Sequence, residues 1–264
     1  MGIFGGDQVA QHAVPAHILA AAKIHPDIIY DTKYGRNPDV DAAEDIVSAG
    51  SQSSGVYTGM PVDANGSMLT VGENFELVCA SADDDSAGTG CQAVEFTYLD
   101  DTGVLRTGEV ATDGLTPVDT GLSGIRAFRL RGATFGSSGT NAGLITLRHI
   151  TTTANIFATI ETGVGQSEIA ALTVPLGYVG LFEQAAVKPD RAGSVTLDAA
   201  LHGRREGQNG FVRKHIIRVS NTDAPFDTGV LWEPELTDVK LRVTTVSTTN
   251  VDVAGQFNYW LLRL

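Results

Sequence analysis

Apolar and polar residues alternate along much of the chain after residue 67. In the segment CQAVEFTYL, Val94, Phe96 and Tyr98 point to one face, whereas Glu95 and Thr97 point to the other, which is typical of a half-buried strand. Similar segments follow at short intervals, separated by loops that hold Gly, Asp, Asn or Ser. The pattern therefore predicts an all-β protein built as an antiparallel β-sandwich or jelly-roll-like module.

A second series of predicted strands begins near residue 170 and ends with the apolar segment NYWLL close to the C-terminus. The join between the two series, TGVGQSEIA, is polar and rich in glycine. Two small sandwiches could meet there, or one larger sandwich could have a loop there. We divide the chain into an arm over residues 1–50, a first half of the sandwich over 51–165, and a second half or second domain over 166–264.

The first 50 residues show little strand alternation. They contain one short predicted helix, Pro15–Ile24, which ends before His25-Pro26, and then a polar and irregular stretch. We interpret this segment as an extended N-terminal arm that docks on a neighbouring subunit; covering its own domain's sheet is an equally weighted alternative. The apolar residues that we expect to make the contact are Ile18, Leu19, Ile28, Ile29 and Tyr30.

Composition and charge narrow the choice of function. Hydrophobic residues make up 42% of the 264 residues and charged residues 19%, as in folded globular chains. The net charge of −13 comes almost wholly from residues 1–133, with 7 basic and 19 acidic residues. An acidic surface repels phosphate and anionic lipid, so we expect neither nucleic acid nor a membrane as a partner.

Motifs of catalysis and cofactor binding do not occur in the sequence: there is no nucleophile elbow, HExxH zinc motif, phosphate-binding loop or dinucleotide fingerprint. The six histidines are scattered. We therefore expect a protein that is not an enzyme and holds no cofactor or metal. The start of the chain resembles no signal peptide, so we expect synthesis in a cytoplasm, where Cys79 and Cys91 stay reduced.

Two charge clusters have more than one interpretation. Asp83, Asp84 and Asp85 could hold Ca²⁺, but we favour an exposed turn whose charges stay in water. A basic cluster surrounds the turn EGQNG, and we expect it to contact the acidic first half of another copy rather than nucleic acid, although a solvated face remains open. Its predicted contact residues are Arg204, Arg205, Arg213 and Lys214.

Three segments resemble a family of virion structural proteins from tailed, podovirus-like bacteriophages. They are GRNPDVDAAEDIV, the stretch from SADDDSAGTG to TNAGLITLR, and LTDVKLRVTTVSTTNVDVAGQFNYWLL. The resemblance implies a structural role in the particle and no catalytic residues. Cys79 and Cys91 depart from the small or apolar residues that we expect at these positions.

From these observations we predict a virion protein that acts by symmetric assembly with itself and with other virion proteins, such as tail, portal, connector or capsid subunits. The leading hypothesis is a tail- or neck-associated protein, such as a connector, a collar or a fibre anchor. The alternatives are a capsid decoration or cement protein and a fibre protein that binds the host surface.

Overall fold

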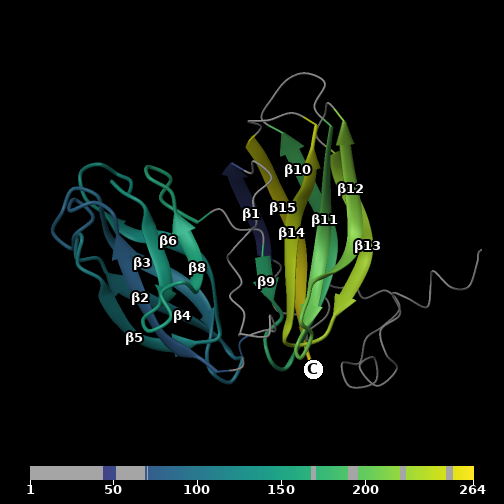
Figure 1. The fold of residues 1–264 in the computed structure, drawn as a ribbon, viewed down its shortest axis with the longest axis horizontal. Helices are drawn as coiled ribbons and strands as arrows, with labels where there is room; N and C mark the ends of the chain where they lie inside the picture. Colours follow the sequence, from purple (N-terminus) through teal and green to yellow (C-terminus); the bar gives the residue numbers. More distant parts are fainter. Residues whose placement is uncertain are drawn as a thin grey trace, which may run out of the picture.

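The computed structural model describes residues 44–51, 69, 71–167, 171–189, 196–220, 224–247 and 252–264. These residues form an all-β protein with two β-sandwiches, which lie side by side in Figure 1. No helix occurs among them. The strands are β1 Glu44–Ser51, β2 Glu73–Cys79, β3 Cys91–Leu99, β4 Leu105–Ala111, β5 Val118–Gly124, β6 Arg126–Phe135, β7 Ile145–His149, β8 Ile156–Ile160, β9 Ala171–Thr173, β10 Tyr178–Pro189, β11 Thr196–Arg205, β12 Val212–Ser220, β13 Ala224–Glu233, β14 Thr237–Val246 and β15 Asp252–Arg263.

The first sandwich packs the sheet β5-β2-β7-β8 against the sheet β4-β3-β6. The alternating residues predicted to face inward, Val94, Phe96 and Tyr98, are buried. Phe75 occupies the middle of this core, where its ring makes edge-to-face contacts with Phe96 and Phe157. Edge-to-face packing brings the positive ring edge to the negative face of its neighbour, so it stabilises these aromatic pairs beyond the area that they bury.

The second sandwich packs the sheet β1-β15-β10-β13 against the sheet β12-β11-β14-β9. The apolar C-terminal segment forms β15, which pairs with β1 on one side and with β10 on the other. Phe257 and Tyr259 are buried in the core between the two sheets. A terminal strand of this composition is thus protected inside a sheet, where its edges are paired.

The all-β prediction is confirmed, and of the two arrangements left open at the join, two sandwiches are present. Three strands, β1, β5 and β13, were not predicted from alternation. Of these, β5 and β13 contain both glycine and aspartate, which lower strand propensity. Of the predicted arm, the last residues form β1 and pair with β15 of the same chain. The predicted helix Pro15–Ile24 and the five apolar arm residues lie outside the described residues.

Cys79 and Cys91 are free thiols in the core of the first sandwich. Burial, with the charge of Asp84 as a further cause, raises the pKa of Cys79 to about 12. Burial raises the pKa of Cys91 to about 11. The Cys91 thiol also donates a hydrogen bond to the Ala93 carbonyl.

We predict that neither thiol reacts with a disulfide reagent in the folded protein. The reacting species is the thiolate, and at pH 8 a pKa near 11 or 12 reduces its fraction by roughly 100-fold or more relative to a free cysteine. Labelling of the native protein, followed by absorbance, is expected to be slow. The same reagent should titrate both thiols in concentrated urea, and rapid labelling of the native protein would contradict the prediction.

Candidate functional site

The two sandwiches meet at a contact that contains both apolar and ionic residues. Leu99, Ile125 and Phe128 of the first sandwich form a small buried cluster with Ala171 at the start of β9. Phe211, just before β12, packs against this cluster. The backbone also connects the two sandwiches, because the amide of Leu176 donates a hydrogen bond of 2.9 Å to the carbonyl of Gly103.

Gly103 is required at this junction. Its φ of +80° lies in the left-handed region, which strains any residue with a side chain. A Cβ atom at this position would also come within 2.8 Å of the Leu236 side chain. The close approach of the loop between β3 and β4 to the second sandwich therefore depends on glycine.

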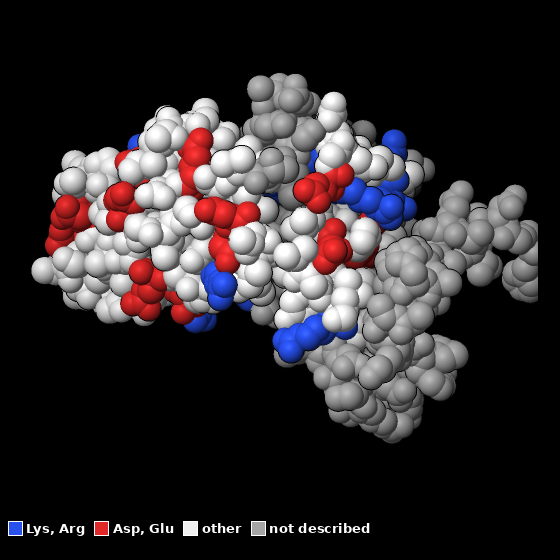
Figure 2. All heavy atoms as spheres, turned by 90° about the horizontal axis from the view of Figure 1, so that it is seen from below, with Lys and Arg blue, Asp and Glu red and all other residues white. Residues whose placement is uncertain are grey.

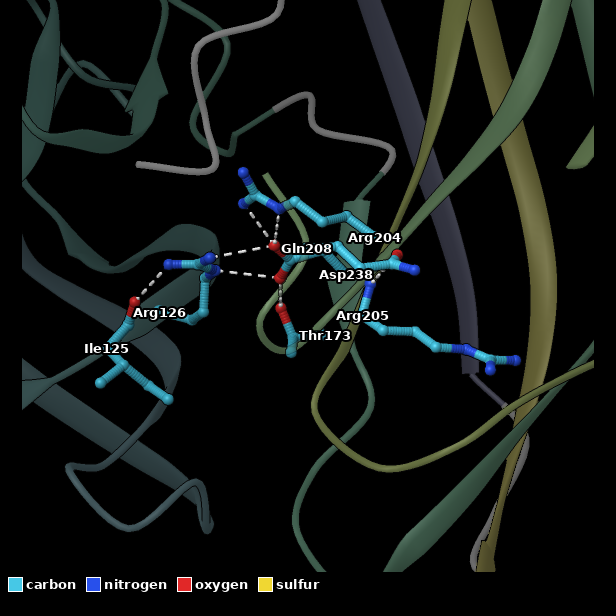
Figure 3. Close-up of polar contacts among 7 residues, drawn as sticks. All are labelled: Ile125, Arg126, Thr173, Arg204, Arg205, Gln208 and Asp238. Carbon is cyan, nitrogen blue, oxygen red and sulfur yellow. Dashed lines mark hydrogen bonds and ion pairs between the residues drawn. The ribbon is translucent and has the colours of Figure 1, made fainter. Parts of the chain in front are cut away.

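A buried carboxylate joins the two sandwiches beside the apolar cluster (Figure 3). Asp238 of β14 accepts hydrogen bonds from Arg126 of β6, with Nε at 3.0 Å from Oδ1 and Nη2 at 2.9 Å from Oδ2. Arg204 of β11 donates to Oδ2 from Nε at 3.0 Å and Nη2 at 2.5 Å, and Thr173 donates to Oδ1 at 2.6 Å. We call these four residues the junction network.

The junction network is almost completely shielded from water, since the side chains of Arg126, Arg204 and Asp238 are 0–2% exposed. Burial by itself raises the pKa of Asp238, but the charges of Arg126 and Arg204 and the hydrogen bonds from Arg126 and Thr173 outweigh it. The pKa of Asp238 therefore lies below its ordinary value of 3.8. The carboxylate is charged at neutral pH and fully bonded, which is the condition under which a buried charge is tolerated.

Two cationic side chains, one of them from the junction network, lie over the ring of Phe211. The guanidinium carbon of Arg204 lies 4.5 Å from the centre of the Phe211 ring, and Nζ of Lys240 lies 3.7 Å from it. An aromatic face attracts a cation through its quadrupole, more strongly where water is displaced. Phe211 thereby connects the apolar part of the contact to its ionic part.

The other end of the first sandwich consists of loops that two buried polar residues hold together. We define the loop tip as residues 80–90, 112–117, 136–144 and 161–165. The carboxylate of Asp84 accepts hydrogen bonds of 2.8 Å from the amides of Cys91, Ala142 and Gly143. The Asp84 carbonyl also accepts a hydrogen bond of 2.8 Å from the Gly114 amide.

Asn141 is the second buried residue that holds the loop tip together. Its Nδ2 donates to the carbonyls of Gly143, at 2.7 Å, and Glu161, at 2.9 Å, and its Oδ1 accepts from the amide of Gly165 at 2.9 Å. Glycine is needed beside Asp84, since a Cβ atom at Gly90 would lie 2.3 Å from Oδ1 of the carboxylate. The loop tip is therefore a preorganised surface, although it has no regular secondary structure.

The prediction of an exposed aspartate turn at Asp83–Asp85 is wrong for Asp84. Asp83 is exposed and Asp85 accepts a hydrogen bond from the Ala87 amide, but Asp84 is completely buried. Its two oxygens bind backbone amides, so this carboxylate is occupied by the fold and is not directed toward a Ca²⁺ ion. Within the described residues, no group of three or more His, Cys, Asp or Glu side chains could hold a metal ion.

The predicted basic cluster is divided by the structure. Arg204 is buried in the junction network and does not contribute to a surface. Arg205 and Arg213 are exposed, and Lys214 is partly exposed with its Nζ at 2.8 Å from Oε1 of Glu233. Glu233 is itself buried, and Arg205 lies 3.7 Å from its other oxygen. The predicted surface therefore keeps three of its four basic residues.

Surface charge differs between the two sandwiches. The sequence has 5 basic and 12 acidic residues over 69–167, but 10 of each over 171–264. In Figure 2 acidic side chains predominate on the first sandwich, whereas basic and acidic side chains lie together on the second. The first sandwich is therefore acidic, whereas the residues of the second carry no net charge.

Apart from Arg204, the residues of the junction network do not stand out in the sequence, and neither does Asn141. Arg126 lies in the apolar segment GIRAFRL, and Asp238 lies at the start of the predicted strand DVKLRV. A charged residue within such an apolar strand indicates that its side chain is buried against a partner, but it does not identify the partner. The partner's identity depends on tertiary structure, because 112 residues separate Arg126 from Asp238.

No helix in the described part of the chain is long and apolar enough to cross a membrane. Comparisons with family models, with curated proteins and with solved structures gave no significant match for this chain.

Proposed function

We propose that this chain is a structural component of a tailed-bacteriophage virion, at the tail or neck, that works by assembling with copies of itself and with neighbouring virion subunits. The observation that carries the proposal is the junction network, which fixes two β-sandwiches relative to each other. A component of a symmetric particle must present its contact surfaces at a constant separation and angle. A buried, bidentate Arg–Asp contact provides this, because it is directional as well as strong.

Two further observations support the same role. The three segments that resemble phage virion proteins include β14 and β15, which form part of the second sandwich. The loop tip contains five acidic residues and no Lys or Arg, whereas Arg205 and Arg213 are exposed on the second sandwich. Opposite charges at an interface set the register of association and exclude wrong partners.

The proposal is tested by the composition of purified particles. Virions from a culture that produces the chain are analysed by quantitative mass spectrometry, and antibodies against the recombinant chain are located by electron microscopy. We expect the chain in the particles at low, symmetric copy number and the antibody at the tail or neck. A copy number in the hundreds with antibody over the capsid would favour a decoration protein. Absence from virions would refute a structural role.

The leading segment gives a prediction with a matched control. Deleting residues 1–43 keeps β1, so we expect an unchanged urea unfolding curve and loss of incorporation into particles. Deleting residues 1–51 also removes β1 and exposes the edge of the apolar strand β15, which is expected to cause aggregation in light-scattering measurements. Normal incorporation of the shorter deletion would show that residues 1–43 are not needed for assembly.

A further inference from the structure

His149, the last residue of β7, is a buried histidine whose two ring nitrogens both face polar groups. Its side chain is 1% exposed, and the centre of its ring lies 6.0 Å from that of Phe75 and 4.5 Å from that of Phe157. Nε2 lies 3.3 Å from the carbonyl oxygen of Gly124, which can only accept a hydrogen bond. Nδ1 lies 3.4 Å from Nδ2 of Asn155, which can only donate one. The neutral ring with its proton on Nε2 therefore satisfies both contacts.

We propose that His149 is an acid-sensitive latch, and that protonation of its ring loosens the loop between β7 and β8, residues 150–155, together with the corner between β5 and β6. The protonated ring carries a hydrogen on both nitrogens, so Nδ1–H points at the Nδ2 donor of Asn155. Oε2 of Glu73 lies 3.6 Å from Nδ1, which is too far for a hydrogen bond. A hydrogen bond for the second proton therefore requires that Asn155 or Glu73 moves.

Glu73, the first residue of β2, is bound to the loop that the latch holds. Its Oε2 accepts hydrogen bonds from the Thr151 hydroxyl and from the Thr152 amide at 3.2 Å, and its Oε1 accepts one from the Thr152 hydroxyl at 2.9 Å. The hydrogen bond from Thr151 holds the pKa of Glu73 below its ordinary value of 4.5, so the carboxylate is charged where a histidine titrates. Movement of this carboxylate toward a protonated His149 breaks hydrogen bonds that fix the loop.

Charged groups face the ring from β2 and from β6. Burial is the main cause that lowers the pKa of His149 from its ordinary value of 6.5, and the charge of Arg126 lowers it further. The backbone hydrogen bond and the charge of Glu73 act in the opposite direction without cancelling the effect of burial. Arg148 is next to His149 in β7 but points to the other face of the sheet, where it pairs with Glu76 at 2.7 Å.

The latch also lies beside the contact between the two sandwiches. Gly124, whose carbonyl binds Nε2, is followed by Ile125 of the apolar cluster at the junction. The Ile125 amide donates a hydrogen bond of 3.0 Å to the Leu99 carbonyl, and its carbonyl accepts one of 2.7 Å from Nη1 of Arg126 (Figure 3). The corner between β5 and β6 thus connects the histidine ring to the junction network. A positive charge on His149 adds to the buried charge of Arg126, so acid loosens this corner as well as the loop.

The direction of the pH effect follows from the buried, neutral state of the ring. The unfolded chain binds the proton near pH 6.5, whereas the folded chain binds it only at lower pH. The contribution of His149 to stability is therefore complete above 6.5 and is lost as the pH falls through the folded-state pKa. This loss begins well above 3.8, the value at which Asp238 begins to contribute.

The test measures hydrogen exchange of the full chain from about pH 7.5 to about pH 5, as protection factors that remove the intrinsic pH dependence of exchange. The amides of Ile150 and Asn155 report on the loop, because they donate to the carbonyls of Asn74 and Thr152. Below pH 6.5 their protection should fall by up to about tenfold per pH unit, as the uptake of one proton requires. Amides of β3, which is paired on both sides, provide the reference.

Asn155→Asp is the most direct variant, because it changes the group that faces Nδ1 from a donor to an acceptor. The new carboxylate stabilises the protonated ring, so the loop should keep its protection over the same pH range. The ring resonances of His149 in NMR spectra should then titrate at higher pH than in the unchanged chain. Asn74→Asp is the matched control, since its side chain is exposed on the neighbouring strand and should leave the pH dependence as it is.

His149→Gln removes the titrating ring and keeps a donor for the Gly124 carbonyl, so it should also lose the pH dependence. Urea unfolding at about pH 7.5 checks that each variant is folded. The inference is overturned if loop protection in the unchanged chain changes no more than that of the β3 amides. It is equally overturned if Asn155→Asp retains the full pH dependence, or if His149 of the unchanged chain titrates at or above 6.5.

Discussion

Replacing Asp238 with alanine is expected to lower the free energy of unfolding by about 3–5 kcal/mol, because it leaves two buried arginines without their carboxylate. Arg126 and Arg204 are both at most 2% exposed, and neither can reach bulk water without opening the contact between the sandwiches. The measurement is urea unfolding followed by fluorescence. Separate transitions for the two sandwiches are expected in the variant, since the ionic part of their contact is lost.

The matched control is an exposed ion pair in the same fold. Arg131 and Glu95 lie 2.7 Å apart with side chains 60% and 29% exposed, so Glu95→Ala should cost at most about 1 kcal/mol. A loss for Asp238→Ala as small as that of the control would show that the junction network is not what holds the sandwiches together.

The pH dependence of stability follows from the same carboxylate. The folded state holds the pKa of Asp238 below its ordinary value of 3.8, so its contribution is complete above that value. As the pH falls below 3.8 the unfolded state binds the proton first, and stability decreases until the folded-state pKa is passed. The Asp238→Ala variant lacks this component, so its stability should change less than that of the unchanged chain in this acidic range.

Replacing Asp84 with alanine is expected to cost about 3–5 kcal/mol and to loosen the loop tip. Three backbone amides lose a charged acceptor, each hydrogen bond to a charged group contributes roughly 1.5–3 kcal/mol, and the contributions at one carboxylate do not add fully. Urea unfolding measures the loss. Limited proteolysis should show new cleavage within residues 80–90 or 136–144.

The neighbouring aspartate supplies the control for this substitution. Asp83 is exposed, and its side chain makes none of the contacts that hold the loops together, so Asp83→Ala should change stability by at most about 0.5 kcal/mol. Equal effects of the two substitutions would mean that Asp84 does not hold the loop tip together.

The strands could be predicted from the sequence because their alternation is local. Val94, Phe96 and Tyr98 are buried as the period of two requires, and the loops with glycine and aspartate separate the strands as predicted. β5 escaped prediction because VDTGLSG has few apolar residues, and its place in the sheet comes from pairing with β2.

The polar centres depend on contacts that no local pattern contains. Asp84 stands between two similar aspartates, and only the approach of residues 142 and 143 distinguishes it. In the sequence, Arg204 appeared to belong to a surface cluster with Arg205. Neighbouring residues in a strand point to opposite sides, however, and the side that becomes buried depends on where the first sandwich docks. Its role therefore required the tertiary structure.

The pairing of β1 with β15 has a consequence for synthesis of the chain. β1 leaves the ribosome before any strand of the first sandwich, and β15 leaves last. The first sandwich can fold while β1 waits for a partner, since domains generally fold as units during translation. The first sandwich is thus inserted within the second, and the polypeptide passes between them twice. A protease cut in only one of these passages would leave the two sandwiches covalently attached. Refolding from denaturant should end with the slow pairing of β1 with β15, which are the paired strands farthest apart in the sequence.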